Sequence, residues 1–527
     1  MLKSRLSLIA LAGIVFIYLA VGWLSLSTAN FGENHDDGIY AVTGRSLAET
    51  GEYRITSLPG EPCQRKYPIV FPAMLAVVWR IAGDFPANIV WLEGVSLLAG
   101  AVFLCLTYGF LRTVGAGGWT AAVIPGICAV LPATGVLANS TMSELAYGAI
   151  SMGALWMLEL AVRVYPSPWL GLAAGLVAGL AYQTRTVGLA LLLAMIIVMA
   201  WRRRWRSLAG GMVGVGLAVG VCRLWQGPAS EVPPIYDYYV NYGGWFLRTA
   251  HDLGWRFAVV VPIKNLIFFV LSVVRTALPE MYDLSGSVPK QFAVVMATIL
   301  VWSTLIHGWV RRRQEAWAIY LLLYFALLTV WPFPPGPRFV VPVLPLILYG
   351  VWEGFQHVRP STRLIRVAAT IVGVVVITVA VSDGDNRLRN ARVKPSLHRY
   401  EWIRRNTSPD DVIACVLDPN CYLYTGRKAV SILSIGDMSL FYGPQGNFHI
   451  RPEKLAEMIR TSKASYMMVE SNPKFPVMLE HARKAVNMLQ QESPGQLEEV
   501  WRDESEEATI YRVREVKIVK DTPMILR

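Results

Sequence analysis

Long blocks of apolar residues, almost free of charge, constrain this chain more than any other feature of its sequence. The first block, residues 6–27, reads LSLIALAGIVFIYLAVGWLSLS. Crossing the hydrocarbon core of a bilayer takes about 20 apolar residues, within a range of about 17–25. Similar blocks lie at residues 88–111, 118–137, 145–162, 168–183, 186–201, 207–225, 291–310, 316–332, 339–356 and 367–382. The sequence therefore predicts a mostly helical, polytopic membrane protein with about eleven transmembrane helices.

Composition narrows the class of protein further. Of the 527 residues, 54% are hydrophobic and 16% are charged, whereas soluble domains usually carry about 25% charged residues. This balance disfavours a soluble enzyme of two or three domains. High apolar content without a glycine repeat also excludes a disordered or collagen-like chain.

The placement of Lys and Arg predicts the orientation, because cytoplasmic loops carry an excess of both. Lys3 and Arg5 place the N-terminus in the cytoplasm. We interpret residues 1–27 as an uncleaved first helix, since the apolar run is too long for a typical signal peptide and further blocks follow. If the eleven blocks alternate, the cytoplasmic loops hold Arg112, Arg163 and the arginines of residues 202–206, 311–313 and 359–366.

Two apolar segments are excluded from this count. Residues 68–83 are short and contain two prolines and Arg80, and residues 256–281 are interrupted by Pro262, Lys264 and Arg275. Counting residues 68–83 as a span would move the next basic cluster to the opposite side. We therefore expect residues 68–83 to form an interfacial helix on the outer surface, and residues 256–281 to lie on the surface or to dip in and return.

The composition changes after Ser382. Residues 383–527 hold 22 Lys/Arg and 20 Asp/Glu, so most of the net charge of +12 belongs to the first 382 residues. The basic excess is thus a signal of topology, since a nucleic-acid footprint would be a basic face on a soluble domain. We predict a transmembrane domain over residues 1–382, with its first outer loop at 28–87, and an extracytoplasmic α/β domain over residues 383–527.

Local patterns support that soluble domain. The stretches DDVIACVLD, ASYMMVE and ATIYRVR are typical of strands, and RPEKLAEMIRTS and KFPVMLEHARKAVNMLQQ of helices. Outside the cytoplasm, Cys415 and Cys421 can pair as a disulfide. Two free thiols are the alternative.

The first outer loop carries a group of acids. Residues 35–40 read HDDGIY, at the start of a stretch with helical spacing. Asp36 and Asp37 begin this helix, where the helix dipole favours carboxylates. One interpretation is an N-terminal cap, and the other is a catalytic carboxylate just above the membrane. We expect His35 to be exposed to solvent. Further on, Lys66 leads into an apolar turn between two prolines, KYPIVFP.

Other polar residues lie where blocks end on the same side. Glu144 begins a block, at a span edge where an acid is costly unless it is paired or wet. A helix-start acid behind Ser or Thr caps is the alternative interpretation. Arg185 lies between two short blocks and Arg338 precedes the tenth block. For each arginine, a simple interfacial anchor is the alternative.

Carboxylates beside fixed cations at a lipid interface suit one chemistry well, the transfer of a sugar from a lipid phosphate to a hydroxyl or amine. A base must accept or orient the acceptor proton, and the leaving phosphate needs donors that strengthen as its charge grows. No zinc-type Cys/His spacing occurs in the sequence, so no metal or cofactor is required. A divalent cation shared by Asp36, Asp37 and Glu144 stays open.

This pattern resembles the GT-C membrane glycosyltransferases, which use polyprenyl- or dolichyl-phosphate sugars. It is most similar to the bacterial branch of the lipid A aminoarabinose transferases, which is related to the protein O-mannosyltransferases. The resemblance runs in order along the whole chain. Its motifs are DDGIYAVTGRSLAETGEY, KYPIVFPAML, SELAY, QTRTVGLALLL, GPRFVVPVLPLIL and YLYTGR.

The resemblance implies roles for single residues. Asp36 matches the catalytic acid and Asp37 the acid beside it. Glu144 matches the second acidic site. Lys66 matches a lysine associated with the lipid phosphate, and Arg338 a late cation near the donor.

Three further residues join this predicted site, and one departs from the pattern. Arg185 is a further candidate for binding the donor phosphate, and Tyr40 and Tyr67 accompany the acids and the lysine. Ile39 replaces a basic residue of the aminoarabinose branch, which favours a different sugar.

The sequence thus predicts an inverting membrane glycosyltransferase, a hexosyl- or pentosyltransferase, that acts at the extracytoplasmic face of a bacterial inner membrane. Its partners would be a polyprenyl-phosphate-sugar donor, membrane lipids and a lipid, glycan or protein acceptor, with no nucleic acid. A transporter or flippase of lipid-linked sugars is the main alternative. Transporters place their polar site near the midplane, often between internal repeats, whereas here the notable charges lie at the rim. A non-catalytic scaffold that displays the soluble tail is the third possibility.

Overall fold

A computed structural model describes most of the chain. The described residues are 2–29, 31–32, 34–228, 232–233, 236–277, 288–357, 362–393, 395–432, 442, 452–471 and 476–514. Their contacts divide the chain into two compact units. The first unit holds residues 1–30, 67–227 and 250–394, and the second holds residues 31–66, 228–249 and 395–527.

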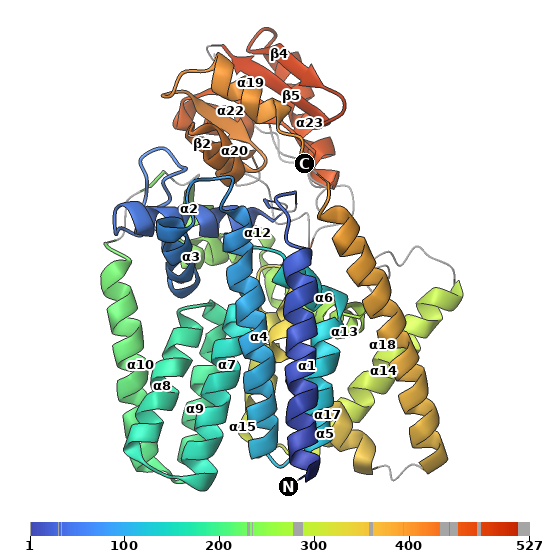
Figure 1. Cartoon of the computed structure of the whole chain (residues 1–527). Helices are drawn as coiled ribbons and strands as arrows, with labels where there is room; N and C mark the ends of the chain where they lie inside the picture. Colours follow the sequence, from blue (N-terminus) through green and yellow to red (C-terminus); the bar gives the residue numbers. More distant parts are fainter. Residues whose placement is uncertain are drawn as a thin grey trace. The chain divides into compact units, whose positions relative to one another are not determined.

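The first unit is a bundle of helices, several of which run side by side (Figure 1). In chain order the helices are α1 (Leu2–Leu24), α3 (Val70–Ile81), α4 (Ile89–Thr113), α5 (Gly118–Val130), α6 (Pro132–Ala138), α7 (Glu144–Glu159), α8 (Pro168–Tyr182), α9 (Leu189–Trp201), α10 (Trp205–Trp225), α13 (Trp255–Arg275), α14 (Val288–Arg311), α15 (Ala316–Thr329), α16 (Pro337–Val340), α17 (Leu344–His357) and α18 (Thr362–Asn390). Every predicted apolar block is helical. The predicted domain boundary after residue 382 falls inside α18.

Helix length and hydropathy give fewer candidate membrane crossings than the eleven predicted from the sequence. Among the described residues, seven helices are long and apolar enough to cross a membrane, and the bent pair α5–α6 makes an eighth if it is one span. The helices α8, α9 and α15 belong to a shorter apolar group of 10–17 residues. The predicted count of eleven is therefore not confirmed. Within the segment 256–281, predicted to lie on the surface or to dip in and return, residues up to Arg275 belong to α13, which has the length and hydropathy of a span. Residues 278–281 lie outside the described residues.

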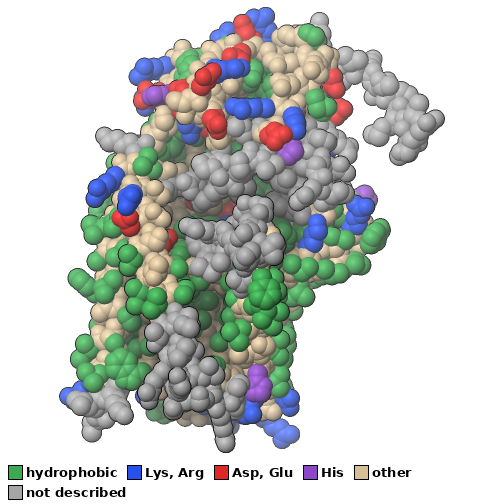
Figure 2. Space-filling view, turned by 90° about the vertical axis from the view of Figure 1, so that its right-hand side faces the viewer, with side chains coloured by type: hydrophobic (Ala, Val, Ile, Leu, Met, Phe, Trp, Pro, Cys, Tyr) green, Lys and Arg blue, Asp and Glu red, His purple; other side chains and the backbone are tan. Residues whose placement is uncertain are grey.

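The outer surface of the helices is rich in apolar side chains. Phe16 on α1 and Leu224 on α10 are exposed over 72% and 86% of their surface, and Figure 2 shows hydrophobic side chains spread over the helices on one face. A bilayer accepts such a surface, and helices satisfy their own backbone hydrogen bonds there. The chain is an integral membrane protein.

Charged side chains at several helix ends form a connected network. Arg163 Nε lies 2.6 Å from Glu159 Oε2, and Arg163 Nη2 lies 3.3 Å from Glu315 Oε1. Arg312 lies 2.8 Å from Glu315 Oε1 and 2.9 Å from Glu353 Oε2. All three carboxylates are buried. Arg163 and Arg312 were among the arginines used to predict the cytoplasmic side. In the structure, both also pair with buried carboxylates.

The helices α8 and α10 approach each other at glycines. A Cβ atom on Gly175 would lie 2.0 Å from the Gly211 carbonyl oxygen, and one on Gly214 would lie 2.3 Å from the Leu172 carbonyl oxygen. Backbone therefore meets backbone across this contact, as small residues permit in membrane helix pairs.

Replacing Gly175 by leucine should destabilise the helical unit by about 1–3 kcal/mol, because the new side chain forces apart a closely packed contact. The measurement is thermal unfolding of the purified chain in detergent. Gly216→Leu on α10 is the matched control, since no atom lies within 4 Å of a Cβ there. Equal melting temperatures for the two variants would contradict the packing.

The second unit combines a small sheet with helices. The described elements are α2 (His35–Glu49), α11 (Asp237–Val240), α12 (Tyr242–Leu253), α19 (His398–Asn406), β1 (Val412–Cys415), α20 (Asp418–Thr425), β2 (Ala429–Ser431), α22 (Pro452–Ser462), β3 (Ala464–Val469), α23 (Pro476–Glu492), β4 (Leu497–Asp503) and β5 (Ala508–Val513). The strand order is β2-β1-β3-β5-β4. β1 pairs in parallel with β2 and β3, and β5 pairs antiparallel with β3 and β4. The predicted strands and helices of the tail are confirmed.

Cys415 and Cys421 both lie in the buried core of this sheet, with Tyr400, Ile413 and Met468. Both are free thiols in the structure. Their burial raises the pKa of Cys415 well above its usual range, so its thiol is protonated.

Segments far apart in the sequence build this unit together. The Ala429 amide of β2 donates to the Ser57 carbonyl oxygen at 2.8 Å. The Ser431 amide donates to the Tyr239 hydroxyl at 2.9 Å. The first loop and residues 228–249 thus pack with the C-terminal domain, an association that the sequence did not predict.

Candidate functional site

The acids of the first loop begin α2, and the two have different surroundings. Asp37 is buried, and its Oδ2 accepts the amides of Gly32 at 3.2 Å and Asn34 at 3.3 Å. Its Oδ1 accepts the Gly38 amide at 2.7 Å. This is the geometry of a capping box, in which an acid at the third helical position satisfies the backbone before the helix. Of the two interpretations offered for these acids, an N-terminal cap and a catalytic carboxylate, the cap describes Asp37.

Asp36 lies one position earlier in α2 and is only partly buried. Its carboxylate sits in the first turn of the helix, where the dipole favours negative charge. Asp37 takes the capping role, and Asp36 is the less buried carboxylate of the pair. Tyr40, one turn later, is buried.

His35 was expected to be exposed, and this expectation is wrong. Its side chain is 10% exposed, and its Nε2 lies 2.8 Å from Oδ1 of Asp418, which is fully buried. The rings of Tyr238 and Tyr239 each lie with their centroids 5.9 Å from the imidazole. No local sequence pattern links these three partners to His35.

Lys66 is also buried, at 5% exposure. Its ammonium nitrogen lies 3.5 Å from the centroid of the Tyr238 ring, a distance at which the ring attracts a cation. The Lys66 amide donates to Gln64 Oε1 at 2.8 Å. Tyr67, the next residue, belongs to the helical unit and is partly buried.

The helical unit brings three predicted site residues together. Glu144 begins α7 and is fully buried, and its Oε1 lies 2.8 Å from Arg185 Nη1 and 3.8 Å from Arg338 Nε. Arg185 also donates to Ser143 Oγ at 3.0 Å. Both guanidinium groups lie over the Phe339 ring, at 5.3 Å and 5.1 Å from its centroid.

The formal charge of this cluster is positive, because two guanidinium groups share one carboxylate. Arg338 is 37% exposed, whereas Arg185 is 13% exposed. Tyrosines of α7 and α15 add hydroxyl groups: Tyr147 and Tyr320 are hydrogen-bonded at 2.8 Å, and the Tyr324 hydroxyl donates to the Phe339 carbonyl oxygen at 2.7 Å. Fixed cations of this kind suit an anionic ligand, and guanidinium geometry matches phosphate.

A further buried acid was missed. Glu93 lies inside the second apolar block, in α4, and its Oε2 accepts the Ser27 amide at 3.3 Å. An ionisable residue in an apolar span is a signal that the sequence offered, since such residues are rare there.

Each unit thus carries part of the predicted site. Within the helical unit Glu144, Arg185 and Arg338 are in contact, and within the second unit Asp36, Asp37 and Lys66 lie on one loop that packs with the C-terminal domain.

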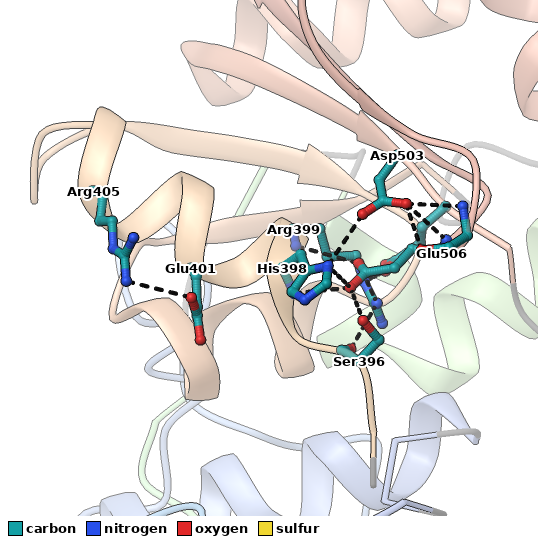
Figure 3. A network of polar contacts seen from close by, with 9 residues as sticks. Ser396, His398, Arg399, Glu401, Arg405, Asp503 and Glu506 are labelled. Atoms are coloured by element: carbon teal, nitrogen blue, oxygen red, sulfur yellow. Dashed lines mark hydrogen bonds and ion pairs between the residues drawn. The ribbon is translucent and has the colours of Figure 1, made fainter.

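The described residues contain a group with the spacing of metal ligands in the C-terminal domain, His398, Asp503 and Glu506, whose ligand atoms lie within 4.8 Å of one another. These atoms already have partners (Figure 3): Asp503 Oδ2 lies 3.2 Å from His398 Nδ1, and Glu506 Oε2 accepts from Arg399 at 2.9 Å. Hydrogen bonds from Ser505 and His398 lower the pKa of Asp503 to about 2. The group is therefore an ionic network that ties α19 to the β4–β5 turn.

Known proteins resemble this chain in structure but not in sequence. No protein-family model and no curated protein sequence matches the chain. The structure of ArnT from Cupriavidus metallidurans bound to undecaprenyl phosphate is similar over 95% of this chain and 97% of ArnT, with a TM-score of 0.57 and 16% identity.

A second similar structure is the archaeal oligosaccharyltransferase AglB from Archaeoglobus fulgidus, in complex with an inhibitory peptide and a dolichol-phosphate. It aligns with 87% of this chain and 69% of its own, with a TM-score of 0.51 and 11% identity. Both neighbours belong to the GT-C superfamily of membrane glycosyltransferases. The chain has the GT-C fold, as the resemblance of its motifs predicted.

Replacing Glu144 by glutamine should destabilise the chain by about 3 kcal/mol, because it leaves two neighbouring cations without their buried counter-charge. Thermal unfolding in detergent measures the effect. Glu49→Gln is the matched control, since Glu49 is an exposed partner of Arg45 and such pairs contribute about 0–1 kcal/mol. A Glu144 variant as stable as this control would show that the cluster does not need its carboxylate.

Proposed function

We propose that this chain is an integral membrane glycosyltransferase that moves a sugar from a polyprenyl-phosphate donor to an acceptor. The observation that carries the proposal is the Glu144 cluster, in which one buried carboxylate holds two arginines and leaves an excess positive charge. The GT-C fold supports it, since ArnT with this fold was solved with undecaprenyl phosphate bound. Fold alone would not suffice, because one fold hosts many functions.

In this proposal Arg185, Arg338 and Lys66 hold the donor phosphate. Charge-assisted hydrogen bonds to a phosphate strengthen as the bond to the sugar breaks and charge grows on the leaving oxygen. Glu144 keeps the two guanidinium groups in place, which is a positioning role for the residue that matches the second acidic site of the family.

Asp36 is the proposed base. It takes or orients the proton of the acceptor hydroxyl or amine while that group attacks the anomeric carbon from the side opposite the phosphate. One displacement of this kind inverts the anomeric configuration. Asp37 holds the first turn of α2 through its backbone contacts and so fixes the direction of Asp36.

The orientation proposed from Lys and Arg placement puts this chemistry on the extracytoplasmic face. The N-terminus then lies in the cytoplasm of a bacterial cell and the C-terminal domain in the periplasm. The acceptor is a lipid, a glycan or a protein of the cell envelope, and the sugar is a hexose or pentose.

Replacing Asp36 by asparagine should lower kcat at least about 100-fold, the contribution typical of a positioned base, and should leave the melting temperature unchanged. The measurement is sugar transfer by the purified chain in vesicles that contain an undecaprenyl-phosphate sugar. Asp84→Asn is the control, since Asp84 is an exposed acid of the same loop. Full activity of the Asp36 variant would remove this residue from the mechanism.

Replacing Lys66 by alanine should raise the donor KM about tenfold and leave the acceptor KM unchanged. A hydrogen bond to a charged group contributes about 1.5–3 kcal/mol, and 1.4 kcal/mol is a factor of ten. Initial rates at varied donor and acceptor concentrations separate the two constants. Lys484→Ala, at an exposed position on α23, should change neither. An unchanged donor KM in the Lys66 variant would count against phosphate binding.

A further inference from the structure

The pairing of His35 with Asp418 joins two residues that lie 383 positions apart in the chain. The imidazole Nε2 and the Asp418 Oδ1 are 2.8 Å apart, and the two side chains are 10% and 0% exposed. His35 is the first residue of α2, and Asp418 is the first residue of α20. The contact therefore joins the N-terminal turns of two helices.

Aromatic rings shield this pair from water. Tyr238 and Tyr239 flank the imidazole, and the Tyr239 hydroxyl accepts the Ser431 amide at 2.9 Å. In such a setting a polar contact is stronger than in water, and losing one partner leaves the other buried and unsatisfied.

The backbone beside the pair is packed equally closely. A Cβ on Gly38 would lie 2.7 Å from the Pro419 side chain and 2.9 Å from Asn420 Oδ1. One on Gly32, which has a φ of +86°, would lie 1.5 Å from Asn420 Nδ2. These glycines flank His35 in the sequence, so both sides of the first turn of α2 are set against α20.

We propose that His35 and Asp418 are positioning residues that hold the first turn of α2, and with it Asp36, against the C-terminal domain. The C-terminal domain is then a part of the catalytic apparatus rather than a separate module. The effect on catalysis rests on the proposed glycosyl transfer, whereas the docking of α2 does not.

Geometry gives the physical reason. Asp36 is the residue directly after His35, and the α2 N-terminus has no covalent tie to α20. A shift of about 1 Å in a catalytic group can cost about 100-fold in rate. Loss of the His35 contact should therefore change the direction of the Asp36 carboxylate more than it changes binding of the donor phosphate.

The test uses the full chain with four variants: His35→Ala, His35→Gln, Asp418→Asn and the double variant His35→Ala/Asp418→Asn. Arg45→Gln is the matched control, because Arg45 lies on the same helix in an exposed pair with Glu49. Hydrogen exchange of the α2 amides reports docking without any substrate, and kcat and donor KM report the catalytic effect.

We expect amide exchange in α2 to rise at least tenfold in His35→Ala and Asp418→Asn, with kcat reduced about tenfold to 100-fold and donor KM within twofold of the wild type. The double variant should resemble either single variant, because both remove the same contact. His35→Gln, which keeps a polar group near the Nε2 position, should recover part of kcat.

Wild-type exchange in α2 of a folded Asp418→Asn variant would overturn the proposal, as would losses that add in the double variant. Both outcomes are judged on α2 and on kcat alone, so a change of amide exchange elsewhere in the C-terminal domain does not affect them. If exchange rises as expected but the wild-type chain transfers no sugar, the docking role stands and the proposed function fails. If the wild type transfers sugar and the variants keep its kcat, the positioning role fails alone.

Discussion

The hydrocarbon interior of a bilayer is the constraint on which the rest of this structure depends. It offers no partners for backbone or side-chain polar groups, so the chain crosses it as helices and keeps most charges at their ends. Several buried acids among the described residues are paired with arginines: Glu144 with Arg185 and Arg338, and Glu159, Glu315 and Glu353 with Arg163 and Arg312. Charge at helix ends thus joins helices at one network, and at the other it forms the cluster that we propose binds the donor phosphate.

The two acidic sites predicted from the sequence differ in what surrounds them. Glu144 is fully buried, and its carboxylate contacts Arg185 and Arg338. Asp36 is partly exposed at a helix start and next to a residue that is anchored in the C-terminal domain. One environment suits binding of a negatively charged group, and the other suits exchange of a proton with an acceptor.

Sequence patterns predicted the features that depend on local order. Apolar blocks predicted the helices, short stretches typical of strands predicted β1, β3 and β5, and the acids before a stretch with helical spacing predicted the start of α2. Contacts between distant residues were beyond such patterns. His35 and Asp418 carry no periodic signal of their pairing, and Arg185 and Arg338, which contact Glu144, lie in segments far apart in the sequence. Pro262 and Lys264 interrupt the apolar run of α13, which nevertheless has the length and hydropathy of a span; a helix in a membrane tolerates such residues when neighbours compensate.

The most direct test of the account is the fate of the donor lipid in vesicles that hold the purified wild-type chain. A synthetic undecaprenyl-phosphate sugar and a mixture of envelope lipids and glycans are supplied, and mass spectrometry follows donor and products. The account predicts that undecaprenyl phosphate appears in step with sugar on an acceptor, joined with inverted anomeric configuration. An intact donor that merely moves from one leaflet to the other would contradict glycosyl transfer and favour a transporter.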